Sequence, residues 1–193
     1  MVSANVNRLF GGQGSYNSWA SLKDSCPHSA MLTLNNKWHK QNALSTEVEC
    51  QEFVYGLVRL AKPEVCLETG SYLGDMSEAI GRALMENGSG ILHTCETDER
   101  LVPQVVKRTQ HLPVIVHPCE GVEVIRDSAE PFDLAFIDSW WMPVRMAEVE
   151  AVVSRITPRG WLLLHDTCQN YGALHDWVEA LGDWRSVVVQ TPY

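Results

Sequence analysis

Carboxylates stand at or just after several short apolar runs of this sequence, where packing alone gives no reason for them. They are Glu68, Glu96, Glu120, Asp138 and Asp166. A carboxylate can attract a cation, accept hydrogen bonds from hydroxyl groups or take up a proton. Asp138, His165 and Asp166 follow two successive apolar runs. We therefore expect these three side chains to lie together and to include the base of a reaction.

A glycine-containing loop follows the first apolar run, over residues 68–74, with the sequence Glu-Thr-Gly-Ser-Tyr-Leu-Gly. Gly70 and Gly74 let the backbone turn tightly and approach a ligand closely. The G-x-G-x-x-G pattern of dinucleotide-binding enzymes is absent, because Tyr72 takes the place of the middle glycine. Glu68 would repel a phosphate and attract a cation. The loop therefore disfavours one alternative, a nicotinamide-dependent oxidoreductase.

Glu96 stands at a spacing that suits a ribose. It lies 22 residues past Gly74, close to the offset of roughly 20 residues at which an acidic residue binds ribose hydroxyls in mononucleotide-binding folds. Together with the loop, this spacing predicts a ligand that combines a ribose with a positively charged part.

The residues between these positions predict alternating strands and helices. A helix is expected from Thr46, whose capping box spans residues 46–49, and Pro63 ends it. Beyond Pro63, strands are expected at 65–67, 91–95, 114–116, 132–137, 161–164 and 187–189, and helices around 76–85, 100–109, 122–125, 144–156 and 172–181. This pattern predicts an α/β fold with a Rossmann-like, doubly wound, mostly parallel sheet that has helices on both faces. Ligands of such sheets bind at the carboxyl ends of the strands.

The composition bounds the class of protein and its partners. The 193 residues suffice for one domain, which we expect over residues 46–193, with residues 1–45 as an N-terminal arm or cap. A net charge of −9 without a basic patch argues against nucleic acid as a partner. No apolar run approaches the roughly 18 residues that a membrane span needs. The expected partner is a small-molecule substrate.

The six cysteines predict reduced thiols and a cytoplasmic protein. Cys66 and Cys95 lie inside apolar runs, and the start of the sequence shows no secretory signal. A zinc site made of Cys26, His28, His39 and Cys50 is disfavoured because the spacing matches no paired-ligand pattern. The remaining histidines that carry no pattern are interpreted as structural, and they are His93, His111, His117 and His175.

The motifs at residues 68–74, at Glu96, at 132–138 and at 158–167 resemble those of class I S-adenosylmethionine-dependent methyltransferases. The sub-group that they resemble is the small-molecule O-methyltransferases related to catechol O-methyltransferase, including a branch whose fifth strand ends in His-Asp-Thr. The resemblance covers about residues 46–170. It implies S-adenosylmethionine as cofactor and O-methylation of a small, hydroxylated molecule.

Carried over by position, the resemblance implies a role for each residue around the cofactor. Glu68 would hold the amino group of the methionine part, and Glu96 would bind the ribose. Cys119 and Glu120 would meet the edge of the adenine, and Trp140 its face. The remaining residues that the resemblance places at the cofactor are Gly70, Ser71, Tyr72, Gly74 and Asp138.

Two positions differ from the catechol-type pattern. Trp141 stands where that group has a lysine base, and Thr167 stands where it has an asparagine metal ligand. We therefore expect transfer without a required divalent ion, with Asp138, His165 or Asp166 taking the proton. The alternative is a Mg²⁺ held by Asp138 and Asp166. His165 is also consistent with a structural histidine that is hydrogen-bonded to a neighbouring loop.

The end of the sequence is shorter than the methyltransferase fold requires. Only residues 185–190 remain where the fold usually supplies two strands, so a shortened C-terminal hairpin and an exposed sheet edge are predicted. Exposed edges are often covered by another chain or by an arm. This predicts self-association into a homo-oligomer. A non-catalytic relative that keeps the fold as a binding or assembly module remains a further alternative.

Overall fold

The computed structural model describes Trp38, residues 40–167 and five single residues nearer the C-terminus, which are Leu174, Trp177, Ala180, Trp184 and Arg185. The predictions for most of the arm, for Cys26, His28, His39, Cys168 and His175, and for the strand at 187–189 lie outside the described residues. The expected helix at 172–181 lies largely outside them too. No helix among the described residues is long and apolar enough to cross a membrane.

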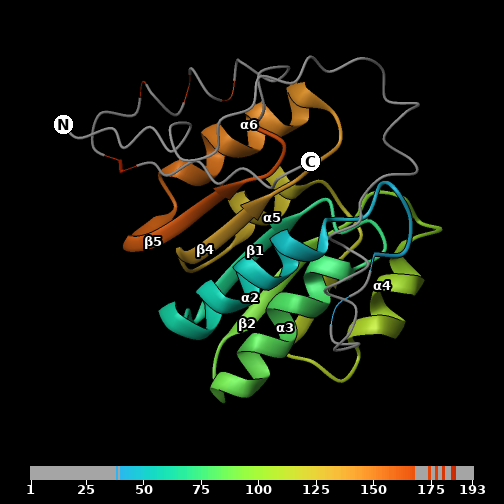
Figure 1. The fold of residues 1–193 in the computed structure, drawn as a ribbon. Helices are drawn as coiled ribbons and strands as arrows, with labels where there is room; N and C mark the ends of the chain where they lie inside the picture. The colour runs from blue at the N-terminus through green and yellow to red at the C-terminus, as the bar shows by residue number, and fades with distance from the viewer. Residues whose placement is uncertain are drawn as a thin grey trace, which may run out of the picture.

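Five parallel strands form one sheet in the order β3-β2-β1-β4-β5 (Figure 1). The strands are β1 Val65–Thr69, β2 Ile91–Cys95, β3 Val114–His117, β4 Phe132–Ile137 and β5 Ile156–Leu164. Strands β2 and β3 lie on one side of β1, and β4 and β5 lie on the other, so the winding reverses between β1 and β4. This is the position at which doubly wound sheets bind their ligands.

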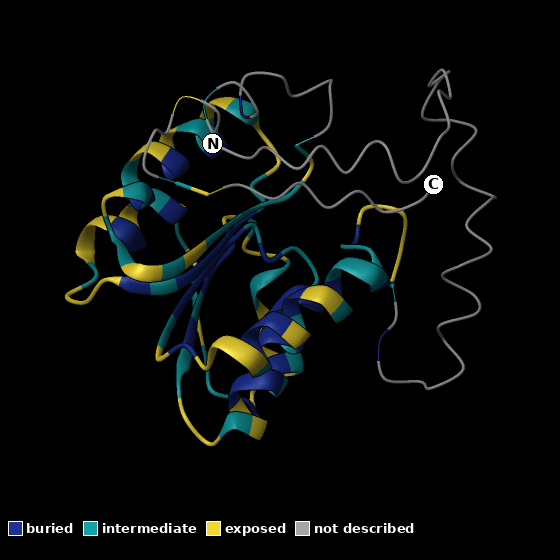
Figure 2. Cartoon of the chain, turned by 60° about the vertical axis from the view of Figure 1, so that its left-hand side comes forward, coloured by how far each residue is buried: buried dark blue, intermediate teal, exposed yellow. Residues whose placement is uncertain are grey.

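Helices cover both faces of the sheet, as the alternating pattern predicts (Figure 2). They are α2 Val48–Ala61, α3 Asp75–Asn87, α4 Val102–Thr109, α5 Gly121–Asp127 and α6 Met142–Val153. Buried residues of α2 and α3 form one core with the sheet, and buried residues of α5 and α6 form a second core on its other face. The predicted doubly wound α/β fold is confirmed.

Strand β4 shows why its residues specify a buried strand. Leu134 and Phe136 pack into the core beside α2 and α3, whereas Ala135 and Ile137 pack into the core beside α5 and α6. Successive side chains of a strand point to opposite faces, so an uninterrupted apolar run satisfies both cores at once.

The predicted start of α2 is wrong in its detail. The N-cap is Glu47 rather than Thr46, and its side chain makes no capping hydrogen bond. The side-chain amide of Gln51 donates instead to the backbone carbonyl of Thr46 at 2.9 Å. The predicted end is confirmed, because the helix stops at Ala61 before Pro63.

The predicted boundary between α6 and β5 is also wrong. The helix ends at Val153, and β5 begins at Ile156 rather than at Trp161. Residues 157–160 form an irregularity in the pairing, because Phe132 pairs with Ile156 and Leu134 pairs with Trp161. Such a bulge tolerates Pro158, which has no N–H to donate.

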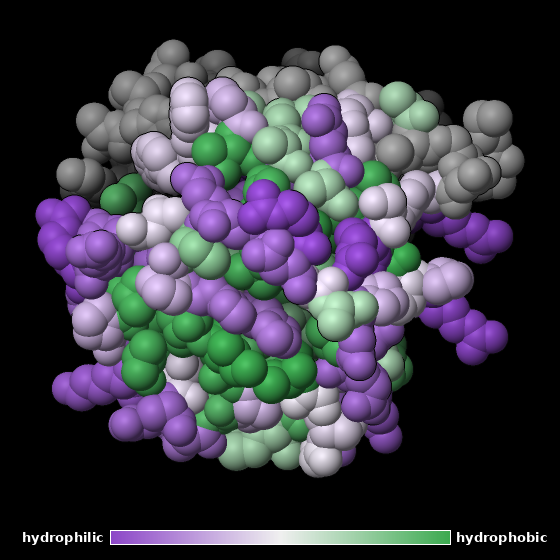
Figure 3. All heavy atoms as spheres, turned by 180° about the vertical axis from the view of Figure 1, so that it is seen from behind, coloured by the Kyte–Doolittle hydropathy of each residue, from purple (hydrophilic) through white to green (hydrophobic). Residues whose placement is uncertain are grey.

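The outer surface carries scattered large apolar side chains. Figure 3 shows hydrophobic residues gathered on the lower part of the back face, between hydrophilic ones. Among the described residues, Val106 of α4 and Ile115 of the edge strand β3 are exposed, as are the tryptophans discussed below.

Candidate active site

The loop between β1 and α3 approaches the end of β4 very closely. Gly70 has a φ of 75°, and a Cβ atom added to it would lie 2.6 Å from the backbone oxygen of Asp138. Gly74 has a φ of 79° and is the N-cap of α3. The predicted tight turn of the backbone at both glycines is confirmed, since L side chains rarely adopt these angles. The amides of Gly70 and Ser71 both donate to the carbonyl of Cys95, at 3.1 and 3.0 Å.

Glu96 fixes this loop from the end of β2. Its Oε2 accepts a hydrogen bond from the amide of Tyr72 at 2.8 Å, and its Oε1 accepts one from the amide of Asp98 at 2.9 Å. Tyr72 adopts a φ of 49°, which the bond to Glu96 stabilises. Each carboxylate oxygen can accept a further bond, so contact with a ribose remains a prediction for Glu96.

Glu68 lies beneath the loop and is fully buried between β1 and α3. Its Oε2 accepts hydrogen bonds from the hydroxyls of Ser77 and Thr94, the latter at 2.6 Å. Burial raises the pKa of Glu68 to about 7, although these hydroxyls lower it. The described contacts of Glu68 are thus with the core under the loop, and its contact with the methionine amino group remains a prediction.

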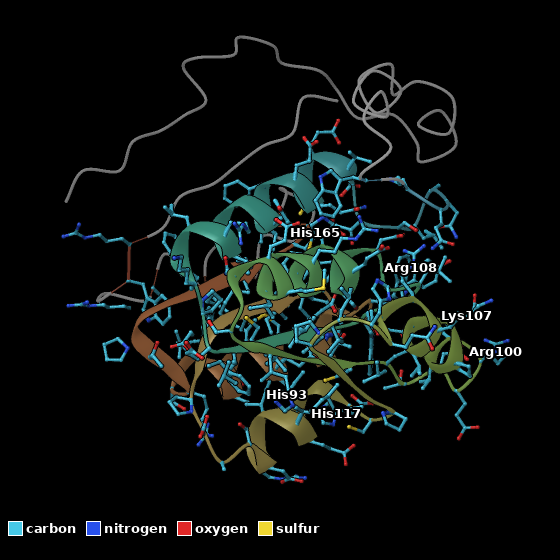
Figure 4. The ribbon with its side chains drawn as sticks, turned by 90° about the horizontal axis from the view of Figure 1, so that it is seen from below. His93, Arg100, Lys107, Arg108, His117 and His165 are labelled. Carbon is cyan, nitrogen blue, oxygen red and sulfur yellow. The ribbon has the colours of Figure 1, made fainter. Side chains whose placement is uncertain are left out.

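The structure brings Asp138, His165 and Asp166 together at the ends of β4 and β5. Nδ1 of His165 lies 3.0 Å from Oδ1 of Asp138 and 3.5 Å from Oδ1 of Asp166. Nε2 of the same ring lies 3.0 Å from Oε2 of Glu47, at the start of α2. Figure 4 shows His165 beneath α2, well apart from the labelled pair His93 and His117.

Both ring nitrogens of His165 face carboxylates, which favours the protonated ring. Burial lowers its pKa, but hydrogen bonds with Asp138, Cys50 and Glu47 and the charge of Asp138 outweigh burial and raise the pKa well above the ordinary value. A protonated imidazole has no lone pair with which to accept a proton, so the raised pKa disfavours His165 as the base. Burial raises the pKa of Asp166, and the charge of His165 offsets part of that effect. Asp166 is also the accessible member of the cluster, with 49% of its side chain exposed.

Sequence reasoning missed Arg145, which ties the cluster to α6. This arginine is buried, and it donates to the carbonyl of Ser139 at 2.8 Å, to the carbonyl of His165 at 2.9 Å and to Oδ1 of Asp138 at 3.1 Å. The available signal was a lone arginine on the face of α6 that also carries Val149 and Val152. Glu47 was missed as well, because its position looked like part of a capping box.

A second carboxylate of α6 supports the same edge. Glu148 is fully buried and accepts hydrogen bonds from the hydroxyls of Thr69 at 2.9 Å and Ser139 at 2.8 Å. Burial raises the pKa of Glu148. A Cβ atom on Gly121 would lie 2.5 Å from Oε1 of Glu148, so a glycine is required where α5 begins. The ends of β1 and β4 are thereby fixed to α6.

The residues predicted to surround the adenine lie along the same edge of the sheet. Trp140 is 84% exposed and Trp141, the N-cap of α6, is 64% exposed. Cys119 is half-buried, and Glu120 forms a capping box with Glu123 at the start of α5. Their contacts with a cofactor remain predictions.

The cluster is compact enough to be considered as a cation site. Ligand atoms of Asp138, His165 and Asp166 lie within 4.8 Å of one another, close enough to share one ion. However, Oδ1 of Asp138 already accepts from Arg145 and lies 3.0 Å from Nδ1 of His165, so an ion would share this oxygen with both groups. The cluster is better described as a network of ion pairs.

His93 and His117 form a separate pair on β2 and β3. Nδ1 of His93 lies 3.0 Å from Nε2 of His117, and burial lowers the pKa of both. Their bond joins two neighbouring strands away from the site. The interpretation of both as structural fits this geometry.

Comparisons with known proteins identify relatives of this arrangement. A family model described as a methyltransferase domain matches residues 67–167, just over half of the chain. No curated protein matches the chain.

Solved structures of low sequence identity share the fold. The O-methyltransferase TomG from Streptomyces achromogenes, in complex with S-adenosylmethionine, has a TM-score of 0.55 and 22% identity over 63% of this chain and 56% of its own. The S-adenosylhomocysteine-bound methyltransferase PaMTH1 from Podospora anserina has a TM-score of 0.59 and 15% identity over 81% of this chain and 73% of its own. An O-methyltransferase from Bacillus cereus has a TM-score of 0.53 and 18% identity over 79% of this chain and 66% of its own. This chain thus spans little more than half the length of TomG.

Proposed function

Because the chain belongs to the methyltransferase-domain family, we propose that it transfers a methyl group from S-adenosylmethionine to an oxygen of a small, hydroxylated molecule. The observation that carries the proposal is the meeting of two groups of residues at the reversal between β1 and β4. The tight loop of Gly70 and Gly74 lies there against Asp138, and the cluster with an accessible Asp166 adjoins it. A cofactor seated on the loop would face the cluster.

The residues around the loop suit this cofactor. Gly70, Ser71, Tyr72 and Gly74 would line the methionine part, and Glu96 would accept hydrogen bonds from the ribose. Trp140 is exposed beside Asp138 and could cover the adenine, with Cys119 and Glu120 at its edge. The close approach of Gly70 to the backbone of Asp138 supports this assignment, because it places the loop directly beside the cluster. When bound, S-adenosylmethionine supplies a sulfonium-activated methyl group.

Asp166 is the residue that we propose as the base. An acceptor hydroxyl must lose its proton as it is methylated, and the proton needs a group within hydrogen-bond reach. The raised pKa of His165 favours its protonated form, and Asp138 is engaged by His165 and Arg145. Asp166 keeps half of its side chain exposed. Positioning of the hydroxyl in line with the methyl group supplies much of the remaining rate.

We propose that this transfer needs no divalent ion, because the two positive groups on Asp138 take the place that a cation would occupy. A cytoplasmic location and self-association also remain proposals. Self-association depends in part on residues 186–193 and on most of the arm, which lie outside the described part of the chain.

The proposed transfer is tested with S-adenosylmethionine that carries a ¹³C-labelled methyl group. The protein is incubated with this cofactor and fractions of hydroxylated small molecules, and the products are examined by NMR. The proposal predicts label on an oxygen atom of a product. Label found only on nitrogen or carbon would contradict it.

A further inference from the structure

The side chain of Glu47 reaches from the start of α2 to the active-site edge of the sheet. Its Oε2 lies 3.0 Å from Nε2 of His165, while Nδ1 of the same ring lies 3.0 Å from Oδ1 of Asp138. One ring nitrogen is thus held by α2 and the other by the end of β4. With an acceptor at each nitrogen, the imidazole of His165 cannot rotate without breaking both contacts.

Glu47 occupies the N-cap of α2, but its side chain contacts His165 instead of capping the helix. An acidic residue at an N-cap normally accepts a hydrogen bond from the first turn of its helix. Glu47 makes no such bond, and Lys40 lies 3.6 Å from its other oxygen. Burial raises the pKa of Glu47, but the hydrogen bond with His165 and the charge of His165 outweigh burial. The net effect lowers the pKa of Glu47 to about 2. The side chain is therefore charged and directed at His165.

The residues just before Glu47 contact the loop proposed for the cofactor. The side-chain amide of Asn42 donates to the hydroxyl of Tyr72 at 3.0 Å. The amide of Gln41 contacts Asp75 and Arg108, where α3 and α4 meet. One short segment, residues 41–47, therefore touches both the loop and His165.

The main chain around His165 is held as firmly as its ring. Its amide donates to the carbonyl of Ile137 at 3.2 Å, and its carbonyl accepts from Arg145 at 2.9 Å. The next residue, Asp166, has a φ of 52°, an uncommon conformation for any residue other than glycine. The held His165 thus fixes the direction in which the Asp166 side chain leaves the chain.

We propose that Glu47 is a positioning residue for methyl transfer: by holding Nε2 of His165, it keeps the ring against Asp138 and Asp166 and so orients the Asp166 carboxylate toward the acceptor. This inference rests on the proposed function. Glu47 itself does not touch the acceptor. Its effect reaches the reaction through one imidazole ring.

The test compares Glu47→Ala and Glu47→Gln with Glu52→Ala, which removes another acidic side chain from the same helix. In ¹⁵N-histidine-labelled protein, the two ring N–H protons of His165 are assigned with a His165→Gln variant. The wild type is expected to show both protons as downfield signals in slow exchange with water. Glu47→Ala should lose the Nε2 proton and keep the Nδ1 proton on Asp138. Glu47→Gln should keep both, since an amide oxygen still accepts a hydrogen bond.

Two further measurements separate positioning from simple structural support. Affinity for S-adenosylhomocysteine should stay within about twofold in all three variants, because Glu47 does not contact the cofactor. Turnover of an acceptor should fall by about ten- to a hundredfold in Glu47→Ala, as expected for a displaced reacting group. It should be largely restored in Glu47→Gln and unchanged in Glu52→Ala.

Several outcomes would overturn the inference. An Nε2 proton that persists in Glu47→Ala would show that Glu47 does not hold the ring. A fall in turnover matched by an equal loss of cofactor affinity would assign Glu47 to the cofactor side. If Glu47→Ala does not melt cooperatively, the test uses Glu47→Gln alone. Loss of the His165 Nε2 proton in that variant would contradict the proposal. A wild type that binds no cofactor refutes the proposed function, and the ring-proton signals still decide whether Glu47 holds His165.

Discussion

Gly70 and Asp138 meet backbone to backbone across the reversal between β1 and β4. A Cβ atom on Gly70 would lie 2.6 Å from the carbonyl oxygen of Asp138 and 3.0 Å from Cα of Ser139. The loop proposed for the cofactor and the strand end that carries the proposed chemistry are therefore in contact. A change in one must displace the other.

Gly70→Ala should damage both stability and cofactor binding. The new methyl group would overlap the Asp138 carbonyl, and a left-handed backbone costs a non-glycine residue roughly 1–2 kcal/mol. We expect a loss of about 2 kcal/mol or more in the free energy of unfolding, measured by urea denaturation, and a weaker complex with S-adenosylhomocysteine. Gly56→Ala is the control, because Gly56 lies inside α2 with open space around it, and its replacement should stabilise by about 0.5–1 kcal/mol. Equal stabilisation by both changes would refute the close contact.

Glu68→Gln should make stability less dependent on pH. The pKa of Glu68 is raised from 4.5 to about 7 in the folded protein, so protonated Glu68 stabilises fully below pH 4.5, and this contribution is lost as the pH rises through 7. The loss amounts to about 3 kcal/mol at most. Glutamine resembles the protonated acid and can still accept from Ser77 and Thr94. In urea denaturation we expect the free energy of unfolding of the variant to be higher than that of the wild type at pH 8. At pH 5 the two values should be similar. A variant that is less stable than the wild type at pH 8 would contradict this interpretation.

Arg145→Met should destabilise the protein by about 3 kcal/mol. The change removes three described hydrogen bonds and leaves buried acceptors on Asp138, Ser139 and His165 without their donor. Arg126→Met is the control, since Arg126 pairs with Asp127 on the exposed end of α5 and its replacement should leave stability nearly unchanged. Thermal melting of both variants measures the difference. Equal melting temperatures of the two variants would show that Arg145 does not hold the cluster.

Turnover should survive an excess of EDTA and fall in Asp166→Asn. Two cationic groups already neutralise Asp138, and the proposed base is the carboxylate of Asp166 itself. Loss of a base typically costs about a hundredfold or more in rate. Asp127→Asn, at the end of α5, should leave turnover unchanged. If chelation stops the reaction and Mg²⁺ restores it, both aspartates become metal ligands and the metal-dependent alternative is correct.

Much of the fold could be predicted because the central strands β1 and β4 are largely buried. The run at 132–137 coincides with β4, since its alternate side chains fill two separate cores. The start of β5 could not be predicted in the same way. Residues 157–160 bulge out of the pairing with β4, and nothing in Thr-Pro-Arg-Gly distinguishes such a bulge from a loop.

The candidate site could be predicted where topology alone determines it. Asp138, His165 and Asp166 follow neighbouring parallel strands, so their proximity follows from strand order. The contact of His165 with Glu47 joins residues 118 positions apart. It depends on how α2 packs on the sheet, which no local pattern encodes. Arg145 depends likewise on the rotation of α6 about its axis.

The central claim is that the loop at residues 70–74 and Glu96 bind S-adenosylmethionine, and calorimetric titration with S-adenosylhomocysteine tests it most directly. The wild type should bind at micromolar strength. Glu96→Ala should weaken binding by about 2–3 kcal/mol, because hydrogen bonds to a charged acceptor contribute roughly 1.5–3 kcal/mol. Glu99→Ala, on the exposed turn that follows, should bind like the wild type. Unchanged affinity in Glu96→Ala would remove Glu96 from the ribose, and a wild type that binds no S-adenosylhomocysteine would contradict the account as a whole.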